Sequence, residues 1–189
     1  MSGPSLIISI FTGIGLAAAA GFRIFLPLFA LSIAARMHLM PLNEKFAWLG
    51  SDIALAILFI ATIVEIGAYL IPWVDHMLDA IAIPLAGIAG TFAVGATLTD
   101  LDPAVTWALA LIAGGGTATA VQASTSTTRV ASTATTGGLA NPVFGAVESV
   151  MSFIFSLLAF VMPVLGVILL LVIGYFVFKI FRKKKQKSL

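Results

Sequence analysis

The segment from Gly114 to Gly138 constrains the fold more than any other part of the sequence. It reads GGGTATAVQASTSTTRVASTATTGG, with Arg129 near its middle. A helix that faces lipid is built from bulky apolar residues, and an arginine at its centre costs about 2.5 to 3.5 kcal/mol on insertion scales. Small and polar residues at membrane depth must therefore face protein or water. We expect this segment to form the functional site of the protein.

The rest of the chain has the composition of an integral membrane protein. Hydrophobic residues make up 60% and charged residues 10% of the 189 residues, which lies outside the range of soluble domains. The net charge of +2 comes from a basic C-terminal end, so no nucleic-acid partner is expected. The absence of cysteine excludes disulfides and thiolate chemistry. No cofactor, metal ligand set or catalytic motif is recognised, and we do not expect an enzyme.

Two long apolar blocks are interrupted by small residues and proline. Residues 5–38 form the first block, which contains Gly21 and Pro27 and is too long for one ordinary span but short for two. Residues 104–142 form the second, which contains the serine and threonine run. We expect each block to be a broken helix, a tight helical hairpin or a re-entrant segment, because glycine and proline interrupt regular helices.

The remaining apolar segments predict an all-α, polytopic transmembrane protein. Residues 1–181 are interpreted as one transmembrane domain and residues 182–189 as a basic cytoplasmic tail. Residues 5–98 and 104–181 repeat one order: an interrupted segment with an arginine, a helix with a glutamate, and a further span. This order indicates an internal two-fold repeat of the kind found in transporters. The helices expected outside the two blocks are Asp52 to Pro72, Ile81 to Leu98, Val143 to Val161 and Val164 to Phe181.

The basic tail predicts the orientation of the protein. Lysine and arginine accumulate on the cytoplasmic side of membrane proteins, so the C-terminus is expected in the cytoplasm. If both interrupted blocks begin and end on one face, Lys45 also lies inside and the halves are parallel repeats. If each block crosses an odd number of times, the halves are inverted. The loop charges leave both arrangements open.

The interior charges have competing interpretations. Arg23 and Arg129 could bind an anionic solute or headgroup, pair with Glu65 and Glu148 to lock the fold, or snorkel from helix ends. The two glutamates could instead couple protons, since burial favours their neutral form. Pairing with an arginine opposes that shift, so the two roles are partly exclusive.

Two short motifs also carry polar groups. Asp75, His76 and Asp79 could form a cation site or contact headgroups, but the spacing is weak evidence and we expect a solvated loop at the membrane edge. In TTGGLANP, Thr135 to Pro142, the glycines are expected to form a bend and Asn141 to cap the next helix. The same bend could expose backbone groups to a site.

Several strings resemble one known family. They are GFRIFLPLFAL, FAWLGS, IPWVDHMLD, PLAG and STATTGGLANPV, which occur in this order between Gly21 and Val143. The chain resembles DUF4126, a domain of unknown function, from Gly15 to about Pro163. The resemblance implies a small multi-spanning protein of the bacterial inner membrane, and it implies no substrate or reaction.

The leading functional hypothesis is transport of a small polar or anionic solute, or of a lipid headgroup. The alternative is a membrane assembly or lipid-organising protein in which the polar segment only packs helices. Membrane lipid and a second copy of the chain are further candidate partners. A water-filled cavity along Thr117 to Thr136 would favour transport, and a dry interface would not. The expected solute contacts are Arg23, Gln122, Ser126, Thr128, Arg129, Thr136 and Asn141, with Glu65 and Glu148 as pairing or proton-coupling groups.

Overall fold

The computed structural model describes the backbone of residues 3–187 and the side chains of residues 5–71, 74, 77–79, 81–176 and 179. This part of the chain is helical and contains no strand, as the apolar composition predicts. Two helical runs are long and apolar enough to cross a membrane, Pro103–Thr136 and Asn141–Val161. A third span results if the bent pair Glu44–Gly50 and Asp52–Ala68 is counted as one. These helices identify a membrane-associated protein.

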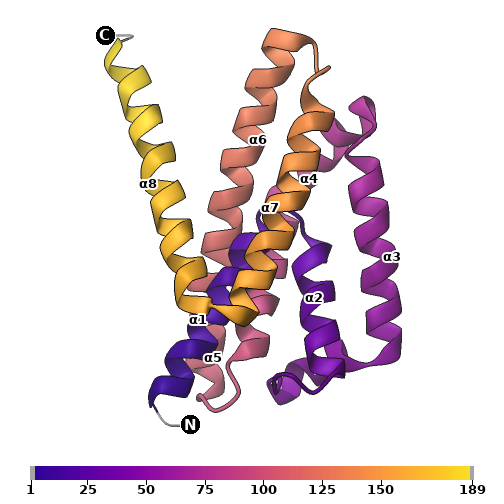
Figure 1. Ribbon diagram of the computed structural model, residues 1–189, viewed down its shortest axis with the longest axis vertical. Coiled ribbons are helices and arrows are strands. Elements are labelled where there is room, and N and C mark those ends of the chain that lie inside the picture. The colour runs from indigo at the N-terminus through magenta and orange to yellow at the C-terminus, as the bar shows by residue number, and fades with distance from the viewer. Residues whose placement is uncertain (1–2, 188–189) are drawn as a thin grey trace.

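The first block is a helical hairpin, which confirms the predicted interruption. Helix α1 (Gly3–Ala20) ends in four alanines that are fully buried, and α2 (Phe25–Arg36) begins after a short break. Pro27 lies in the first turn of α2, where its missing N–H costs nothing. In Figure 1, α1 rises to about mid-height and α2 returns toward the same end of the molecule.

The next two helices cross the molecule in opposite directions (Figure 1). A 3₁₀ helix, η1 (Glu44–Gly50), leads into α3 (Asp52–Ala68) with a bend of 68°. One face of α3 is apolar and exposed, with Ile53, Ile57 and Ile60 each at least 60% accessible. Helix α4 (Pro72–Thr97) then continues through Pro84. The loop expected at residues 75–79 is therefore wrong, because these residues form the second turn of a long helix.

The second block differs from the expected hairpin. Helix α5 (Pro103–Leu109), the π-helical η2 (Ala110–Gly115) and α6 (Gly116–Thr136) form one run of 34 residues. No proline lies between Pro103 and Pro142 to end it. Its glycines allow close packing instead of a bend, since a Cβ on Gly90 of α4 would lie 2.5 Å from the Gly114 carbonyl oxygen. The interruption in this block is the π-helical segment.

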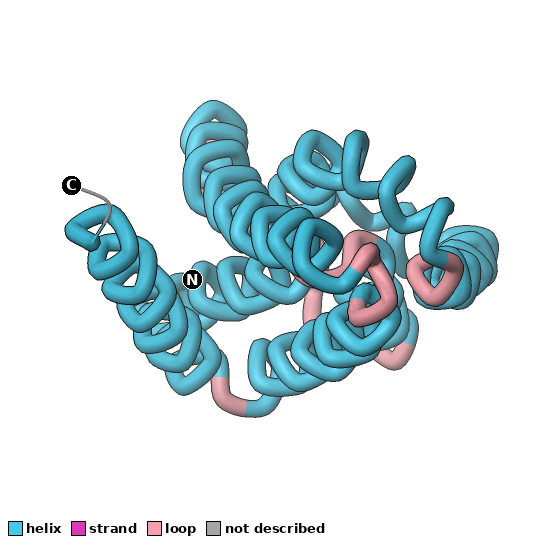
Figure 2. The backbone as a smooth tube through the Cα atoms, turned by 90° about the horizontal axis from the view of Figure 1, so that it is seen from above, coloured by secondary structure: helices cyan, strands magenta, loops and turns pink. Residues whose placement is uncertain are grey.

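The last two helices run in opposite directions (Figure 1). Helix α7 (Asn141–Val161) follows a turn with Gly137 and Gly138 at positive φ, and α8 (Pro163–Lys187) follows the predicted boundary at Pro163. Helices α3 and α8 lie at opposite edges of the molecule in both views (Figures 1 and 2). The C-terminus and η1 lie at opposite ends in Figure 1. The first block thus returns to its starting end whereas the second crosses.

Candidate functional site

Arg23 lies in the break between α1 and α2 and is only 1% exposed. Its Nε donates a hydrogen bond to Ser149 Oγ at 2.9 Å, and its Nη2 donates one to the carbonyl oxygen of Gly145. A Cβ at Gly145 would lie 3.2 Å from Nη2, so glycine leaves room for the guanidinium. Nη2 also lies 3.9 Å from Glu148 Oε2. One side chain therefore ties the first block to α7.

Glu65 stabilises the start of α2. Its Oε1 accepts from the backbone N–H of Ile24 at 2.8 Å, and Oε2 accepts from that of Phe25 at 3.0 Å. Helix N-termini carry unpaired N–H groups and a partial positive charge, so a carboxylate is favourable there. The structure differs here from the expected pair of Arg23 with Glu65. The arginine turns to α7, and the glutamate caps the helix that follows the arginine.

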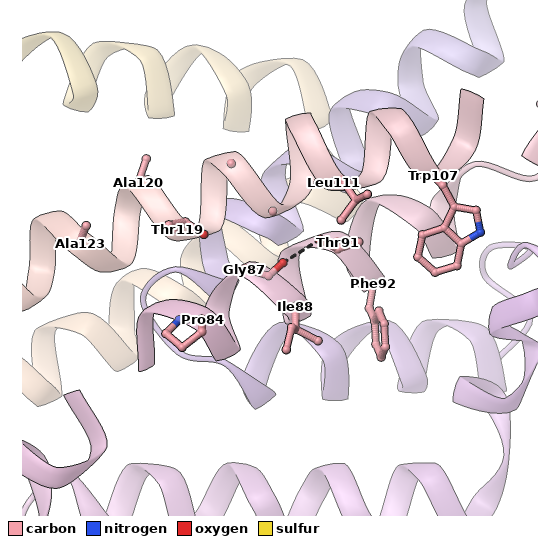
Figure 3. Close-up of a pocket in the computed structure, with 12 residues that line it drawn as sticks. Pro84, Gly87, Ile88, Thr91, Phe92, Trp107, Leu111, Thr119, Ala120 and Ala123 are labelled. Atoms are coloured by element: carbon pink, nitrogen blue, oxygen red, sulfur yellow. Dashed lines mark hydrogen bonds between the residues drawn. The ribbon is translucent and has the colours of Figure 1, made fainter. Parts of the chain in front are cut away.

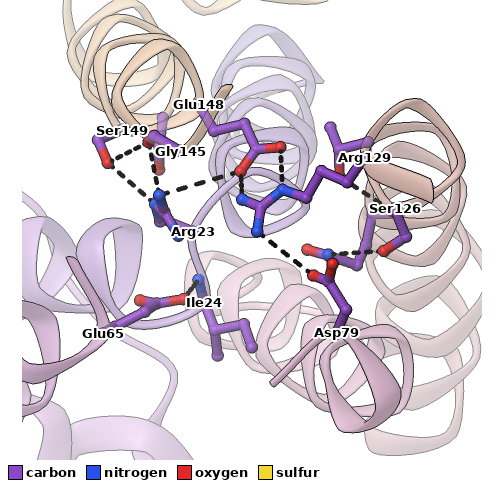
Figure 4. Close-up of polar contacts among 12 residues, drawn as sticks. Arg23, Ile24, Glu65, Asp79, Ser126, Arg129, Gly145, Glu148 and Ser149 are labelled. Atoms are coloured by element: carbon purple, nitrogen blue, oxygen red, sulfur yellow. Dashed lines mark hydrogen bonds and ion pairs between the residues drawn. The ribbon is translucent and has the colours of Figure 1, made fainter. Parts of the chain in front are cut away.

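Arg129 on α6 joins two carboxylates. Its Nε donates to Glu148 Oε1 at 3.0 Å and its Nη2 contacts Glu148 Oε2 directly, a bidentate pair. Its Nη1 lies 3.5 Å from Asp79 Oδ1 on α4. Figure 4 shows Glu148 between the two arginines, with contacts to both. Arg129 and Glu148 expose only 2% and 6% of their surfaces, so the pair is screened little by solvent.

Tyr69 completes this cluster and has no counterpart among the sequence expectations. Its ring lies 4.1 Å from the guanidinium carbon of Arg23 and 4.1 Å from that of Arg129. Guanidinium groups are attracted to the negative face of an aromatic ring. Tyr69 lies one helical turn after Glu65, so a helix drawn through both predicts a shared face. This spacing from Glu65 is the feature of the sequence that points to Tyr69.

Asp79 was expected in a membrane-edge loop, but α4 carries it into the interior. Its side chain is 15% exposed and contacts Arg129. The side chains of Asp75 and His76, which were grouped with it in the sequence, lie outside the described residues. Gly145 and Ser149, the α7 partners of Arg23, were also not expected. Both flank Glu148 on the helix face that meets the first block.

The other expected contact residues fall into three places. Gln122 donates to Ser126 Oγ at 3.2 Å, and Figure 4 shows Ser126 beside Asp79 and Arg129. Thr128 is exposed on another face of α6. Thr136 lies seven residues beyond Arg129, about 10 Å along the helix, and Asn141 donates to Thr133 at 3.1 Å. Gln122 and Ser126 thus lie beside the arginine cluster, whereas Thr136 and Asn141 lie at the turn between α6 and α7.

Asn141 also differs from the expected cap. It is the first residue of α7, the cap position is Ala140, and no side chain caps that helix. Its side-chain amide instead donates to Thr133 on α6. Because Thr133 precedes Gly137 and Gly138, this bond joins the two sides of the turn between α6 and α7. Pro142 occupies the first turn as expected.

A cleft of about 960 Å³ lies between α6, α7 and α8. Its α6 wall carries hydroxyl groups, and its other walls are bulky and apolar. Glu148 is at the boundary between the cleft and the buried cluster. The hydroxyl residues are Thr117, Ser124, Thr125 and Thr128 on α6 and Tyr175 on α8, and the apolar residues are Phe22, Ala120, Val121, Phe144, Val147, Met151, Phe155, Leu170, Leu171 and Ile173.

A family comparison covers almost all of this architecture. Residues 10–183 match the model of the domain of unknown function DUF4126, a range that holds residues 10–38 of the first block, the whole second block and every member of the polar cluster. The chain belongs to the DUF4126 family. No curated protein matches it, and no solved structure does.

A second, shallower groove on the DUF4126 chain is almost entirely apolar (Figure 3). It runs along α4, η2 and α6 and measures about 710 Å³. Its one hydrogen bond in Figure 3 joins Thr91 to the carbonyl of Gly87 at 2.8 Å within α4. Pro84, Phe92, Trp107 and Leu111 line it without a charged group. The groove therefore offers no chemistry comparable to the cleft.

The polar cluster of the DUF4126 chain holds charged groups in the interior of the protein. Arg23, Arg129, Glu65, Glu148 and Asp79 bring two cations and three carboxylates together in the interior. Most of their hydrogen-bonding capacity is spent on one another and on backbone groups. Within the described part of the chain, no three His, Asp or Glu side chains lie close enough together to hold a metal ion. The arrangement is suited to holding α2, α4, α6 and α7 at fixed positions.

Proposed function

We propose that this protein is a membrane transporter for a polar or amphiphilic solute, and that the α6–α7–α8 cleft is its binding site. The supporting observation is the unequal lining of the cleft, with hydroxyls on α6 and apolar side chains on α7 and α8. Its volume of about 960 Å³ is at the upper end of ordinary ligand pockets. Ser124, Thr125 and Thr128 donate to carbonyls of their own helix, so their lone pairs are left for water or a polar solute in the cleft.

The arginine cluster acts in this proposal as the lock beside the site. Arg129 is occupied by Glu148 and Asp79, and Arg23 by Gly145, Ser149 and the Tyr69 ring. Neither arginine is among the cleft-lining residues. The solute contacts therefore shift from the arginines to Thr128, Ser124 and Thr125, with Glu148 linking the cleft to the cluster.

The proposed location is the bacterial inner membrane with the C-terminus in the cytoplasm. The family resemblance supports the membrane, and the lysines and arginines after Phe178 support the orientation. In this orientation η1 lies on the outer side, because it is at the other end of the molecule from the C-terminus (Figure 1).

A membrane assembly protein is the second candidate, favoured by the first turns of α6. Gly87 and Gly90 on α4 face Gly114, Gly115 and Ala118 at distances that exclude a larger residue. This is the close packing that small residues allow between membrane helices. It accounts for the beginning of the polar segment but not for its exposed hydroxyls beyond Ser124.

Water in the cleft distinguishes the two candidates. The chain has no cysteine, so single cysteines can be labelled without background. Thr128→Cys faces the cleft, and Val130→Cys, two residues away, is 68% exposed on α6 outside it. In liposomes, a charged methanethiosulfonate reagent should modify Thr128→Cys and leave Val130→Cys unmodified. Protection of both would remove the transport proposal and leave the assembly role.

Uptake into liposomes then tests transport itself. Gly174 lines the cleft, and a Cβ atom added at this position would meet no atom within 4 Å. Gly174→Trp should therefore fill the cleft without disturbing the fold and abolish uptake from a panel of labelled polar and amphiphilic solutes. Gly67→Trp is the matched control, because Gly67 is equally open but lies on α3. Equal uptake by both variants and the parent chain would contradict the proposal.

A further inference from the structure

The hydroxyl groups on the cleft wall have a defined polarity. Ser124 donates its proton to the Ala120 carbonyl at 2.9 Å, Thr125 to that of Gln122 at 2.9 Å, and Thr128 to that of Ser124 at 3.0 Å. A hydroxyl has one proton and two lone pairs, so a hydroxyl bonded in this way presents only its lone pairs to a ligand. These three residues line the cleft as hydrogen-bond acceptors.

The ionisable group on the cleft wall is also an acceptor. Glu148 lines the cleft, whereas Arg23 and Arg129 do not. An ionised carboxylate offers about four lone-pair sites, and the bidentate contact with Arg129 uses two of them. Glu148 therefore keeps the capacity to accept further hydrogen bonds. Arg23 Nη1 has no hydrogen-bond partner in the described part of the chain, but it is a buried donor away from the cleft lining.

The remaining walls favour an apolar body and a positive charge. Phe22, Phe144, Phe155 and Tyr175 contribute aromatic rings, and rings attract cations as well as apolar groups. Behind Glu148 the cluster contains two further carboxylates, those of Glu65 and Asp79, and two guanidinium groups. Glu65 is directed at the amides of α2, so the charge that faces the cleft is that of Glu148.

We infer that the cleft binds a lipophilic ammonium ion, with its chain against α7 and α8 and its head toward Glu148 and the Thr128 hydroxyl. The inference rests on the proposed function for its transport role and names the substrate class. Beside Glu148 an anionic solute would meet a carboxylate and the lone pairs of Ser124, Thr125 and Thr128, whereas an ammonium head donates hydrogen bonds to these acceptors. The interior arginines had suggested an anion, but neither lines the cleft, and Arg129 is paired with Glu148 and Asp79.

Binding is measured first, apart from transport. The full chain in phosphatidylcholine nanodiscs is titrated with labelled octylammonium, octanol and octanoate, with empty nanodiscs as the reference for partition into lipid. We expect specific binding in the order ammonium, alcohol, carboxylate. Octanoate binding as tightly as octylammonium would overturn the inference. Displacement of octylammonium by phosphatidylethanolamine in the disc would support the ammonium assignment and identify a lipid headgroup as its source.

Two variants locate the bound ion. Thr128→Val removes the acceptor with little change in shape and should weaken octylammonium binding about three- to tenfold, the value of one hydrogen bond. Thr127→Val is the matched control, because Thr127 makes the same bond to its own helix, to Ala123, but does not line the cleft. Gly174→Trp should abolish binding and Gly67→Trp should not. Equal effects within either pair would place the ion elsewhere and overturn the inference.

The two proposals fail differently. Specific octylammonium binding with no uptake into liposomes would remove transport and leave the ligand assignment. Uptake of anions that octylammonium does not inhibit, blocked by Gly174→Trp, would retain transport and overturn the ligand assignment.

Discussion

The two interrupted blocks contain similar residues but differ in their backbone structure and in the partners of their charged groups. The first breaks at residues 21–24, and its arginine projects from non-helical backbone to α7. The second continues as helix from Pro103 to Thr136, and its arginine projects from a regular turn. Each is followed by a helix with a buried glutamate, yet Glu65 caps backbone amides and Glu148 pairs with guanidinium.

The difference shows that a repeated order of residue types does not ensure a repeated geometry. A break exposes backbone N–H groups, and these are the nearest partners for a buried carboxylate. A continuous helix satisfies its own N–H groups, so the carboxylate beside it meets the arginine instead. The presence or absence of a break therefore decides what each glutamate does.

The largest effect is expected at Arg129. Arg129→Met leaves Glu148 and Asp79 buried beside an uncharged side chain and should lower the free energy of unfolding by about 3 to 5 kcal/mol. Thermal and denaturant unfolding in detergent measures the loss. Arg23→Met should lower the free energy of unfolding by less. Its partners Ser149 and Gly145 are neutral, and Glu148 still pairs with Arg129 in this variant. Arg36→Met, in an exposed pair with Asp52, should cost under about 1 kcal/mol.

An equal loss for Arg129→Met and Arg23→Met would show that the two arginines play the same role, against the comparison. Arg129→Met combined with Glu148→Leu should recover part of the stability, since it removes the unpaired charge.

A smaller effect is expected where the second block packs against α4. A Cβ on Gly114 would overlap the Gly90 carbonyl oxygen and lie 2.8 Å from the Val94 side chain. Gly114→Ala should cost about 1 to 3 kcal/mol through this overpacking. Gly116→Ala meets no atom within 4 Å and should stabilise by about 0.5 to 1 kcal/mol. Thermal unfolding should therefore show a loss of stability for Gly114→Ala and a gain for Gly116→Ala. A gain for both variants would show that the second block packs more loosely against α4.

The cap on α2 is expected to contribute about 1 to 2 kcal/mol. Glu65→Ala removes both acceptors for the amides of Ile24 and Phe25, whereas Glu65→Gln keeps one acceptor oxygen. Amide hydrogen exchange should therefore rise at the start of α2 in the order Glu, Gln, Ala. Exchange that rises instead around Arg23's partners on α7 would indicate a direct pairing of Arg23 with Glu65. Glu44→Gln, on the exposed surface of η1, is the control.

The smallest effect is expected at the end of the second block. Gly137 has a φ of 64°, and its Cβ position is empty. Gly137→Ala should cost about 1 kcal/mol, because only the left-handed backbone opposes the added methyl group. Thermal unfolding measures this loss. A larger loss, with altered labelling of Thr128→Cys, would mean that the turn also controls the cleft.

Several elements were predictable from particular residues. Gly21 and Pro27 indicated the first break, the helices expected from Val143 and Val164 agree with α7 and α8, and the pairing of Arg129 with Glu148 was one of the interpretations of the interior charges. Asp79 was misplaced because its polar neighbours resemble a loop, while Pro72 starts a helix that continues through them. Tyr69 and Ser149 were missed because single neutral residues carry no pattern.

Composition and proline positions defined an all-helical membrane-associated chain with a polar segment that avoids lipid, because burial and backbone constraints act along the sequence. They did not fix the partners of that segment. Whether α6 broke and which carboxylate each arginine met depended on contacts between helices distant in the chain. Glycine packing against α4 kept α6 straight, and the splayed position of α8 left its hydroxyl face open as a cleft.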